Sequence, residues 1–391
     1  MSEANPAATG LNVDPTALLG ARGGVGRQLL VSGIAIFLGL AVGAVLIVLS
    51  GAIKPDGVLD LTLPLTAYGA MIDGALWNDE GLNLRGIGNA LNAATPLILA
   101  GLAVAFAFRA GLFNIGANGQ FLVGAFCAAI VATNMVNVPI LVALPLSIAA
   151  GAVGGGLWGL IPGALKAWRG AHEVVTTIML NNIAGLLLNL LASTTFRDPA
   201  ATFPRTPDIQ PGTDLPVILE GTRLHAGIFI ALLAAFGVWF LLFRTTLGFE
   251  IRTVGANPNA ARYAGIRPAL IIVLTMTIAG GLAGLAGSTE ILGITGNYPA
   301  EYFTTLGFDG IAVALLGRAH PIGVIGGALL FGFMRAGAGS MQRATDIPVD
   351  IIQVVQGVIL LFVAAEVVIR RLLPAVRARR RAAAATSEGA S

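Results

Sequence analysis

The chain has 391 residues, of which 56% are hydrophobic and only 11% are charged, and its formal net charge is +3. Soluble domains usually carry roughly 25% charged residues, so this composition excludes an ordinary soluble protein. The arginines flank apolar segments, which the orientation rule for membrane proteins explains better than nucleic-acid binding does. The single cysteine, Cys127, excludes an internal disulfide, and the three histidines show no metal-ligand spacing.

Apolar runs recur along the chain at about 20 residues each, the length that one membrane-spanning helix needs. Only helices and closed barrels satisfy the backbone inside lipid, so the predicted fold is all-α: a polytopic transmembrane helical bundle with about ten spans. The predicted spans are Leu29–Leu49, Ala90–Phe108, Phe121–Met135, Val138–Trp168, Thr176–Ala192, Ala226–Phe243, Ala269–Leu292, Phe308–Leu316, Ile322–Gln342 and Ile351–Ile369. The third and eighth are short, and the fourth is long enough to be tilted.

The distribution of charge predicts the orientation of the bundle. Arg244–Arg267 carries four arginines and one glutamate, and the tail from Arg370 carries six arginines and one glutamate, so both are expected in the cytoplasm. Gly51–Gly88 and Ser193–His225 are richer in acidic than in basic residues, which fits the outside. Ten spans with both the N-terminus and the C-terminus cytoplasmic satisfy all four segments.

The predicted organisation has three parts. A cytoplasmic tail covers residues 1–28, a transmembrane domain covers 29–370 with a cytoplasmic segment at 244–267, and a basic cytoplasmic tail covers 371–391. Leu61–Leu76 is apolar but too short to span, and it is expected to form a helix lying at the outer surface.

Two polar, glycine-bearing breaks interrupt apolar sequence, at Gly111–Gln120 and at Gly307–Gly310. In the first, Asn114, Asn118 and Gln120 supply hydrogen-bond donors and acceptors. Unwound backbone at membrane depth is tolerated only where it is buried in protein or lines a water-filled cavity. Paired interruptions in the two halves of a chain point to a translocation site, and the alternative is helix packing through small residues.

Further candidates lie beside these breaks. Thr177 and Asn181 are four residues apart, so they share one face of a predicted helix. They would either line a solute path or hydrogen-bond a neighbouring helix, and the sequence leaves both readings open. Phe113 and Phe308 border the breaks and are candidates for stacking or gating rings.

The basic segment at 244–267 contains the signals of a short capped helix. Asparagine is a favoured N-cap, proline is favoured at the first helical position, and glycine commonly ends a helix. The residues in this pattern are Asn257, Pro258, Ala260, Ala261, Ala264 and Gly265. Such a helix suits docking onto a soluble partner, and the alternative is an ordinary interfacial loop.

The chain lacks the motif of an ATP-hydrolysing subunit. Its two lysines, Lys54 and Lys166, do not follow glycine, so there is no Gly-Lys-Ser/Thr phosphate loop. No convincing nucleophile–base set or metal cluster is present either, which argues against an enzyme. If transport is driven by ATP, another subunit supplies the ATPase.

At these motifs the sequence resembles a known family. Gly111–Gln120, Glu173–Asn182, Arg252–Ile266 and Gly307–Gly317 are similar, in order and spacing, to the permease subunits of ABC importers of the ribose, branched-chain amino acid and nucleoside group. The resemblance covers roughly Leu29 to Ile369. It is greatest to the larger permease of purine-nucleoside systems of the basic membrane protein type.

The resemblance implies partners that the residues alone do not reveal. They are a second permease in a probable heterodimer, a cytoplasmic ABC ATPase that binds ATP and magnesium, and an extracytoplasmic solute-binding protein, all at a bacterial inner (plasma) membrane. No cofactor is expected in this chain. The positions that resemble the ATPase-coupling helix and its flanks are Arg252, Gly255, Asn257, Pro258, Ala260, Ala261 and Gly265.

The expected function is import of nucleosides, with purine nucleosides favoured by the resemblance. Neutral nucleosides suit amides, hydroxyls and aromatic rings better than fixed charges. The predicted pathway residues are Phe113, Asn114, Asn118, Gln120, Thr177, Asn181 and Phe308. Asn118 departs from the family pattern, in which glutamate is expected.

Two alternatives are weighed against nucleoside import. The first is the same machine carrying a monosaccharide or another small polar solute. The second is an ion-coupled secondary transporter, which needs ionisable residues at mid-membrane and would have to use Arg109 and Asp309. The central parts of the predicted spans are nearly free of Asp, Glu and Lys, which argues against ion coupling.

Overall fold

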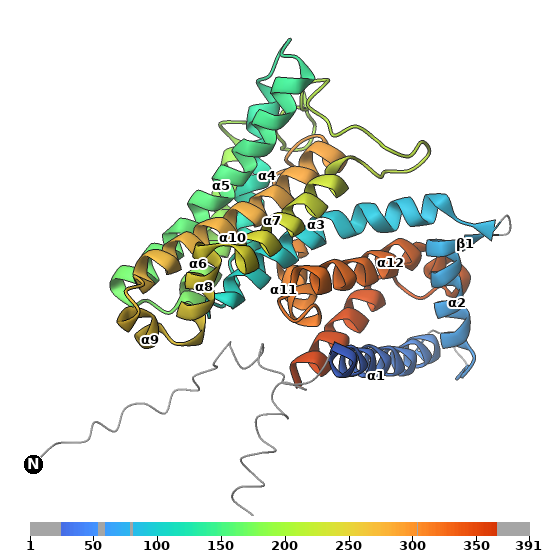
Figure 1. The fold of residues 1–391 in the computed structure, drawn as a ribbon. Helices are drawn as coiled ribbons and strands as arrows, with labels where there is room; N and C mark the ends of the chain where they lie inside the picture. The colour runs from blue at the N-terminus through green and yellow to red at the C-terminus, as the bar shows by residue number, and fades with distance from the viewer. Residues whose placement is uncertain (1–24, 54–58, 79–80, 303, 366–391) are drawn as a thin grey trace, which may run out of the picture.

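The computed structural model describes residues 25–53, 59–78, 81–302 and 304–365, and most of them are helical (Figure 1). The long helices are α1 (Val25–Ala52), α3 (Leu84–Arg109), α5 (Ile140–Arg169), α6 (Glu173–Ser193), α7 (Gly227–Arg244), α10 (Pro268–Glu290) and α12 (Pro321–Thr345). The shorter elements are α2 (Leu63–Leu76), the paired two-residue strands β1 (Trp77–Asn78) and β2 (Gly81–Leu82), α4 (Ala117–Thr133), α8 (Thr246–Ala256), α9 (Pro258–Tyr263), the π-helix η2 (Ile291–Thr295), α11 (Leu306–Leu316) and a last helix over Asp350–Ala365.

The all-α prediction is confirmed, and each of the ten predicted spans overlaps a helix. Within the described residues, 7 helices are long and apolar enough to cross a membrane, and three shorter apolar helices accompany them. The count of ten spans and the positions of both termini stay predictions. Most of the tail expected at 1–28, the end of the tenth span and the whole tail expected at 371–391 lie outside the described residues, and α1 already begins at Val25.

Helix α3 forms the centre of the bundle. It is apolar on all its faces, the composition expected of a helix that is surrounded by protein, and almost every residue from Ala94 to Phe108 is buried. Helices α7, α10, α11 and α12 pack around it. The C-terminal end of α3 is therefore held in a fixed position, which matters because the first predicted break begins there.

Helices α5 and α10 form the most extensive contact in the described structure, and glycines make it. A Cβ atom built at Gly284 would lie 2.2 Å from the carbonyl oxygen of Gly151, and one at Gly280 would lie 2.3 Å from that of Gly155. Membrane helices associate through such small residues because lipid provides no hydrophobic force between them. The glycine face of α5 therefore packs a helix and does not line a path.

The short apolar segment at Leu61–Leu76 forms α2, as predicted. The Oη atom of Tyr68 on α2 donates to the carbonyl oxygen of Leu40 on α1 at 2.7 Å. On its other side α2 packs against α12, where a Cβ atom at Gly337 would lie 2.1 Å from the carbonyl oxygen of Met71. Helix α2 runs across the ends of α1 and α12 (Figure 1), as a helix lying at a membrane surface would.

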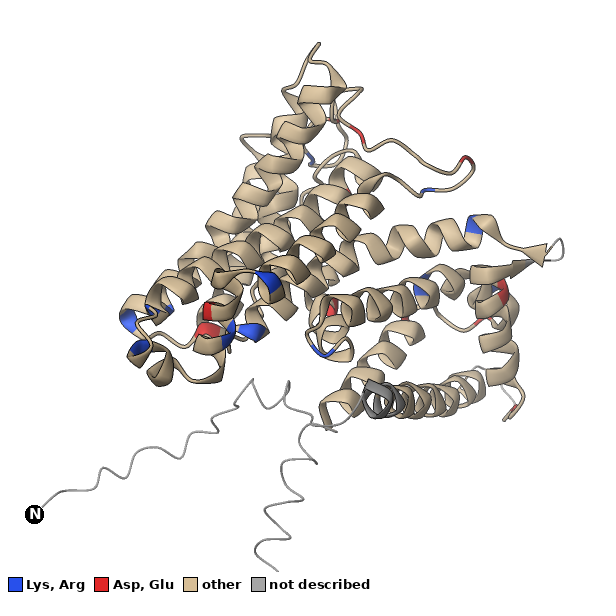
Figure 2. Cartoon of the chain, in the orientation of Figure 1, with Lys and Arg blue, Asp and Glu red and all other residues tan. Residues whose placement is uncertain are grey.

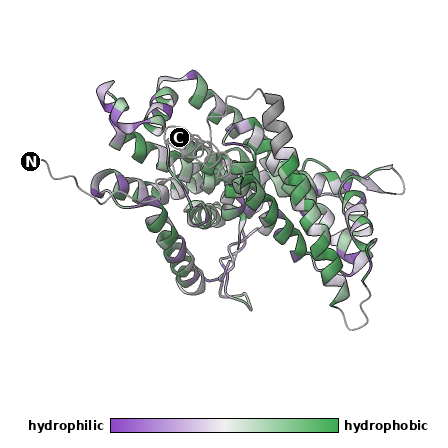
Figure 3. Cartoon of the chain, turned by 90° about the horizontal axis from the view of Figure 1, so that it is seen from below, coloured by the Kyte–Doolittle hydropathy of each residue, from purple (hydrophilic) through white to green (hydrophobic). Residues whose placement is uncertain are grey.

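The charges gather at the ends of the helices (Figure 2). One end carries α8, α9 and a group of arginines, and we call it the basic end; the other carries the long connection 194–226, and we call it the loop end. Between them the outer faces are predominantly hydrophobic (Figure 3), as a lipid-facing surface requires.

Candidate translocation site

The first predicted break is real and lies between α3 and α4. The α-helix stops at Arg109, Gly111 has a left-handed φ of +74°, and helix resumes at Ala117. The break is shorter than the polar run Gly111–Gln120, because Asn118 and Gln120 already belong to the first turn of α4.

Asn114 and Gln120 satisfy each other. The Nδ2 atom of Asn114 donates to Oε1 of Gln120 at 2.9 Å, and Nε2 of Gln120 donates back to Oδ1 of Asn114 at 3.2 Å. Both side chains are almost completely buried, and neither reaches the cavity described below. Their amides therefore stabilise the unwound segment, since unpaired buried amides would be costly. The prediction that they contact solute stays untested.

Asn181 on α6 holds the same break from the opposite side. Its Oδ1 atom accepts from the backbone N–H of Gly119 at 2.8 Å, and its Nδ2 atom donates to the carbonyl oxygen of Ile115 at 3.0 Å. The Thr177 hydroxyl, one turn earlier, donates within α6 to the carbonyl oxygen of Glu173 at 2.7 Å. The shared face is confirmed, and Asn181 combines both readings because it binds a neighbouring helix and also lines the cavity.

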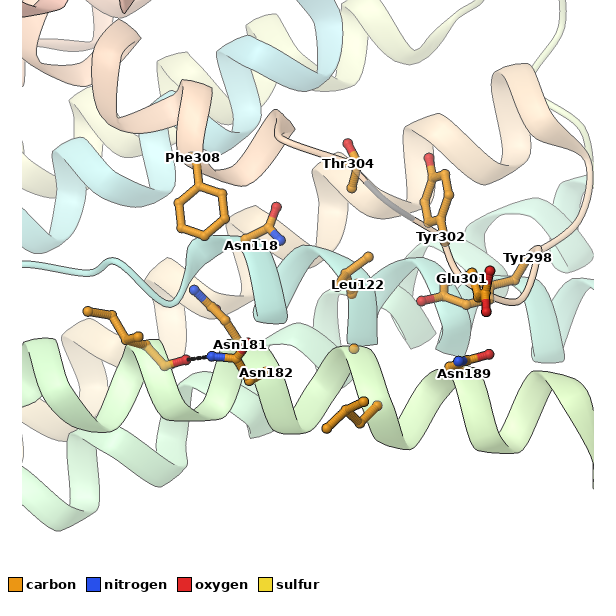
Figure 4. A pocket seen from close by; sticks show the side chains of 13 residues that line it. Asn118, Leu122, Asn181, Asn182, Asn189, Tyr298, Glu301, Tyr302, Thr304 and Phe308 are labelled. Atoms are coloured by element: carbon orange, nitrogen blue, oxygen red, sulfur yellow. Dashed lines mark hydrogen bonds between the residues drawn. The ribbon is translucent and has the colours of Figure 1, made fainter.

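A cavity of about 310 Å³ lies between α6, the first turns of α4 and α11, and the segment that precedes α11 (Figure 4). Phe308 stands at one end beside Asn118 and Asn181, and Tyr298 and Glu301 stand at the other end (Figure 4). The cavity is lined by Asn118, Leu122, Ile178, Asn181, Asn182, Gly185, Leu186, Asn189, Tyr298, Glu301, Tyr302, Thr304 and Phe308. The polar groups of this lining are mainly asparagine amides, and its aromatic rings are those of Tyr298, Tyr302 and Phe308.

Asn118 lines this cavity and has a buried amide oxygen without a partner among the described residues. Its side chain is only 8% exposed, and its Oδ1 atom has no hydrogen-bond partner within the described structure. An unpaired buried amide oxygen costs about 1–3 kcal/mol, so a bound water or solute donor would be favourable there. Asn118 is the cavity residue whose chemistry points most directly to a ligand.

The second predicted break is misplaced. Gly307–Gly310 lies in the first turn of α11, and the non-helical stretch comes earlier, between η2 and α11. The glycines do not interrupt the helix, because Gly307 and Gly310 serve close packing against α4 and α3. Gly307 packs so closely on α4 that a Cβ atom there would lie 2.3 Å from the Cα atom of Asn118. Phe308, the next residue, projects into the cavity wall (Figure 4). The first turns of α4 and α11 therefore meet at Asn118, with Asn181 opposite.

Three predicted pathway residues line the cavity, and four do not. Asn118, Asn181 and Phe308 line it, whereas Asn114, Gln120 and Thr177 lie behind its wall. Phe113 packs on Phe108, with ring centroids 5.1 Å apart. The polar and aromatic lining residues absent from the prediction are Asn182, Asn189, Tyr298, Glu301, Tyr302 and Thr304.

Part of that missing set had a signal in the sequence. Asn182 and Asn189 are seven residues apart and share a helical face, a spacing that the pattern on α6 already suggested. Burial raises the pKa of Tyr298, and burial with the nearby Glu290 raises that of Tyr302. Both phenols therefore stay protonated and can donate hydrogen bonds to a solute.

His225 is a buried residue at the loop end, beside η2. It is 1% exposed, its Nδ1 atom accepts from the backbone N–H of Gly227 at 3.1 Å, and its ring lies against Gly293. Burial lowers the pKa of His225 to about 4, so the ring is neutral at physiological pH. A π-helix at this position is notable because such turns occur frequently at functional sites.

At the basic end, the capped helix is confirmed as predicted. The Oδ1 atom of Asn257 accepts from the backbone N–H groups of Asn259 and Ala260 at 2.9 and 3.1 Å, and Pro258 occupies the first position of α9. Gly265 follows with a left-handed φ of +80°.

Not all of the predicted docking residues of this segment are exposed. The predicted small-residue face is divided, because Ala261 is buried against the bundle while Ala260 and Ala264 are exposed. Pro258 is exposed, so the start of α9 remains open to a partner. Gly255 is buried and rests on the end of α3, where a Cβ atom would lie 2.2 Å from the carbonyl oxygen of Arg109. Gly255 and Ala261 therefore belong to the attachment of the segment to the bundle.

An aromatic cluster connects α8 with the ends of α3 and α11. The guanidinium groups of Arg109 and Arg252 lie 5.4 and 5.5 Å from the ring centroid of Phe243, and His320 stacks on the same ring. Arg109 also donates through Nε to the carbonyl oxygen of Ala319 at 2.8 Å. Arg109 thus has structural partners.

Comparisons with known proteins identify the family of the chain. A family model described as the permease component of branched-chain amino acid transport systems matches residues 86–364. The chain belongs to this permease family. The matched region of the permease includes the cavity, both predicted breaks and the segment at 244–267.

Curated relatives cover nearly the whole permease. The guanosine ABC transporter permease protein NupP of Bacillus subtilis (strain 168) is 42% identical over 88% of this chain and 95% of its own length. The nucleoside ABC transporter permease protein NupB of Lactococcus lactis is 35% identical over 93% of this chain and 98% of its own length. The glucose ABC transporter permease protein TsgB13 of Haloferax volcanii is 34% identical over 83% of this chain and 87% of its own length. No solved structure matches the chain.

Proposed function

We propose that this chain is the larger membrane-spanning permease of an ATP-driven importer that carries nucleosides into the cytoplasm, with purine nucleosides preferred. The observation that carries the proposal is the cavity where the first turns of α4 and α11 meet α6. It offers amides at Asn118, Asn181 and Asn182 and aromatic rings at Tyr302 and Phe308. A nucleoside has a flat base for stacking and many hydrogen-bonding atoms, so it matches this lining. The names of the relatives in Bacillus subtilis and Lactococcus lactis support the same solute class.

A second permease is part of the proposal. The chain is also 31% identical to the guanosine permease protein NupQ and 27% identical to the nucleoside permease protein NupC, from the same two organisms as the relatives above. Each organism thus holds two different permeases of one solute class, and this chain covers the first of each pair more completely. We therefore expect a heterodimer of permeases, a soluble ATPase docked at α8 and α9, and an extracytoplasmic binding protein.

The orientation follows from the charges. The arginines at α8 and α9 support an orientation in which the basic end faces the cytoplasm at a bacterial inner membrane, and the loop end then faces outside. ATP and magnesium would bind only to the partner ATPase. Binding and hydrolysis there would switch the permease pair between its outward-facing and inward-facing states, and the permease would provide the cavity to which access alternates.

A hexose or pentose is the second candidate solute, because the glucose permease protein of Haloferax volcanii is similar over most of the chain. The decisive experiment is uptake of labelled guanosine, adenosine, ribose and glucose by cells that express the chain with the ATPase and permease encoded beside it. Guanosine uptake that requires the ATPase and is competed by unlabelled nucleosides would support the proposal. Uptake of sugar alone would replace the solute, and uptake that survives loss of the ATPase would refute the ABC mechanism.

A further inference from the structure

An ion pair joins α11 and α12 next to the cavity. A terminal guanidinium nitrogen of Arg335 lies 2.5 Å from the Oδ2 atom of Asp309, which also accepts from the Thr305 hydroxyl at 2.8 Å. The two charged side chains are 24% and 23% exposed. Arg335 and Asp309 thus form a compact polar group that is paired but open on one side.

The position of Arg335 along α12 makes this exposure informative. Among the long helices of the described chain, it is the only charged residue more than two turns from both helix ends. A charge at the centre of a membrane helix costs about 2.5–3.5 kcal/mol on insertion scales, so such residues face water or protein and avoid lipid. The open side of the pair must therefore face a polar environment.

The residues of the ion pair neighbour cavity-lining residues in the sequence, although their own side chains are not part of the cavity lining. Asp309 directly follows Phe308 in the cavity wall, and Thr305 follows Thr304, which also lines the cavity. A strip of polar side chains therefore leads from the cavity across the first turn of α11 to the middle of α12.

We propose that the face of α11 and α12 carrying Asp309 and Arg335 is a water-filled extension of the cavity, and that this pair is a second contact site for the solute. The guanidinium offers a planar set of donors to ring nitrogens and carbonyl oxygens, and the carboxylate accepts from N–H groups and sugar hydroxyls. A neutral heterocycle with adjacent donors and acceptors can contact both. The solute assignment rests on the proposed function, whereas the water-filled face does not.

The water-filled face is tested by thiol accessibility in the assembled transporter. Cys127→Ala first removes the native thiol, and Gly339→Cys then places one on the face of Arg335, one turn further along α12. Gly237→Cys on the outer face of α7 is the matched control, because a Cβ atom meets no neighbour at Gly237 and only the tip of Arg343 at Gly339. A permanently charged methanethiosulfonate reagent should modify Gly339→Cys at least tenfold faster than Gly237→Cys. Equal rates would overturn the proposal.

The contact role is tested by guanosine uptake. Arg335→Gln and Asp309→Asn should each raise the KM for guanosine about tenfold while the unstimulated ATPase rate stays within twofold of the parent. In the exchanged variant Asp309→Arg/Arg335→Asp, the pair can re-form but its donors and acceptors have changed places, so KM should stay high. Recovery of the parental KM by the exchange would show a purely structural ion pair and would overturn the contact role. If the parent took up no guanosine, the nucleoside proposal would fail while the thiol rates still decided the water-filled face.

Discussion

Gly255→Ala is the substitution that most directly tests how the basic end is connected to the cavity. Gly255 lies in α8, and its Cα atom contacts the backbone where α3 ends and the first break begins. A methyl group there would lie 2.2 Å from the carbonyl oxygen of Arg109 and 2.9 Å from the carbonyl carbon of Ala110. Both obstacles are backbone atoms, so no side-chain rotation can relieve the contact.

The size of the effect follows from that geometry. An ordinary contact between a methyl carbon and an oxygen begins near 3.4 Å, so α8 and the end of α3 must separate by about 1 Å. Overpacking of this kind costs about 1–3 kcal/mol, against a gain of roughly 0.5–1 kcal/mol for replacing glycine by alanine inside a helix. We expect a net destabilisation of about 1–2 kcal/mol. The larger consequence is a displaced junction between the α8–α9 segment and the break.

The assay compares Gly255→Ala with Gly237→Ala, a helical glycine beside which a methyl group meets nothing within 4 Å. Both variants are purified with their partner subunits in nanodiscs, and the measurements are thermal stability, unstimulated ATPase and the increase of ATPase by guanosine with its binding protein. Gly255→Ala should melt at a lower temperature and lose most of the stimulated increase. Gly237→Ala should retain both properties or gain slightly in stability. If the two variants behaved alike, the proposed contact between α8 and α3 would not transmit the state of the ATPase.

Three further outcomes are expected. Asn257→Ala should weaken the start of α9 by about 1 kcal/mol, since a lost N-cap costs that much, and co-purification of the ATPase with the permease pair should fall while the melting temperature of the pair stays the same; unchanged co-purification would argue against docking at α9. Asn118→Leu should abolish guanosine uptake without loss of folded protein, whereas Asn134→Leu, at the exposed end of α4, should leave uptake unchanged; uptake that survives the first substitution would remove Asn118 from the site. Because the folded pKa of His225 is about 4 and the unfolded value near 6.5, protonation favours the unfolded state, so stability is complete above pH 6.5 and falls as the pH drops toward 4. At pH 5 the loss is about 2 kcal/mol, seen as a lower melting temperature than at pH 8, and His225→Phe should remove this acid sensitivity; an equal dependence on pH in both proteins would refute the assignment.

The helices were predictable from sequence because apolar length and capping signals act locally. The start of α9 at Asn257 and Pro258 depends only on neighbouring backbone groups, and the structure places it where the sequence does. The first break was predictable for the same reason, since glycine and amides at membrane depth have few explanations. The second was placed wrongly, because Gly307 and Gly310 serve close packing of α11 on its neighbours and do not interrupt it. The limits of the first break were less certain, because no local signal distinguishes its last residues from the first turn of α4.

The direction in which each amide points was not predictable. Asn114, Asn118 and Gln120 are equivalent in a pattern of donors and acceptors, yet two of them pair with each other and the third faces the cavity. Which amide faces the cavity depends on contacts between α4, α6 and α11, and these helices are separated by long stretches of chain. Gly307 packed on Asn118 and the Arg335–Asp309 pair are contacts of the same kind, visible only after the helices are assembled.

The glycine seam between α5 and α10 also has a consequence for motion. Carbonyl oxygens of Gly151 and Gly155 occupy the space beside Gly284 and Gly280, so sliding one helix along the other would drive larger neighbours into these positions. Helices α5 and α10 are therefore expected to move together as one rigid body. Displacement near the cavity is then left to segments without such packing, such as the connection from η2 to α11, which lines the cavity with Tyr298, Glu301, Tyr302 and Thr304.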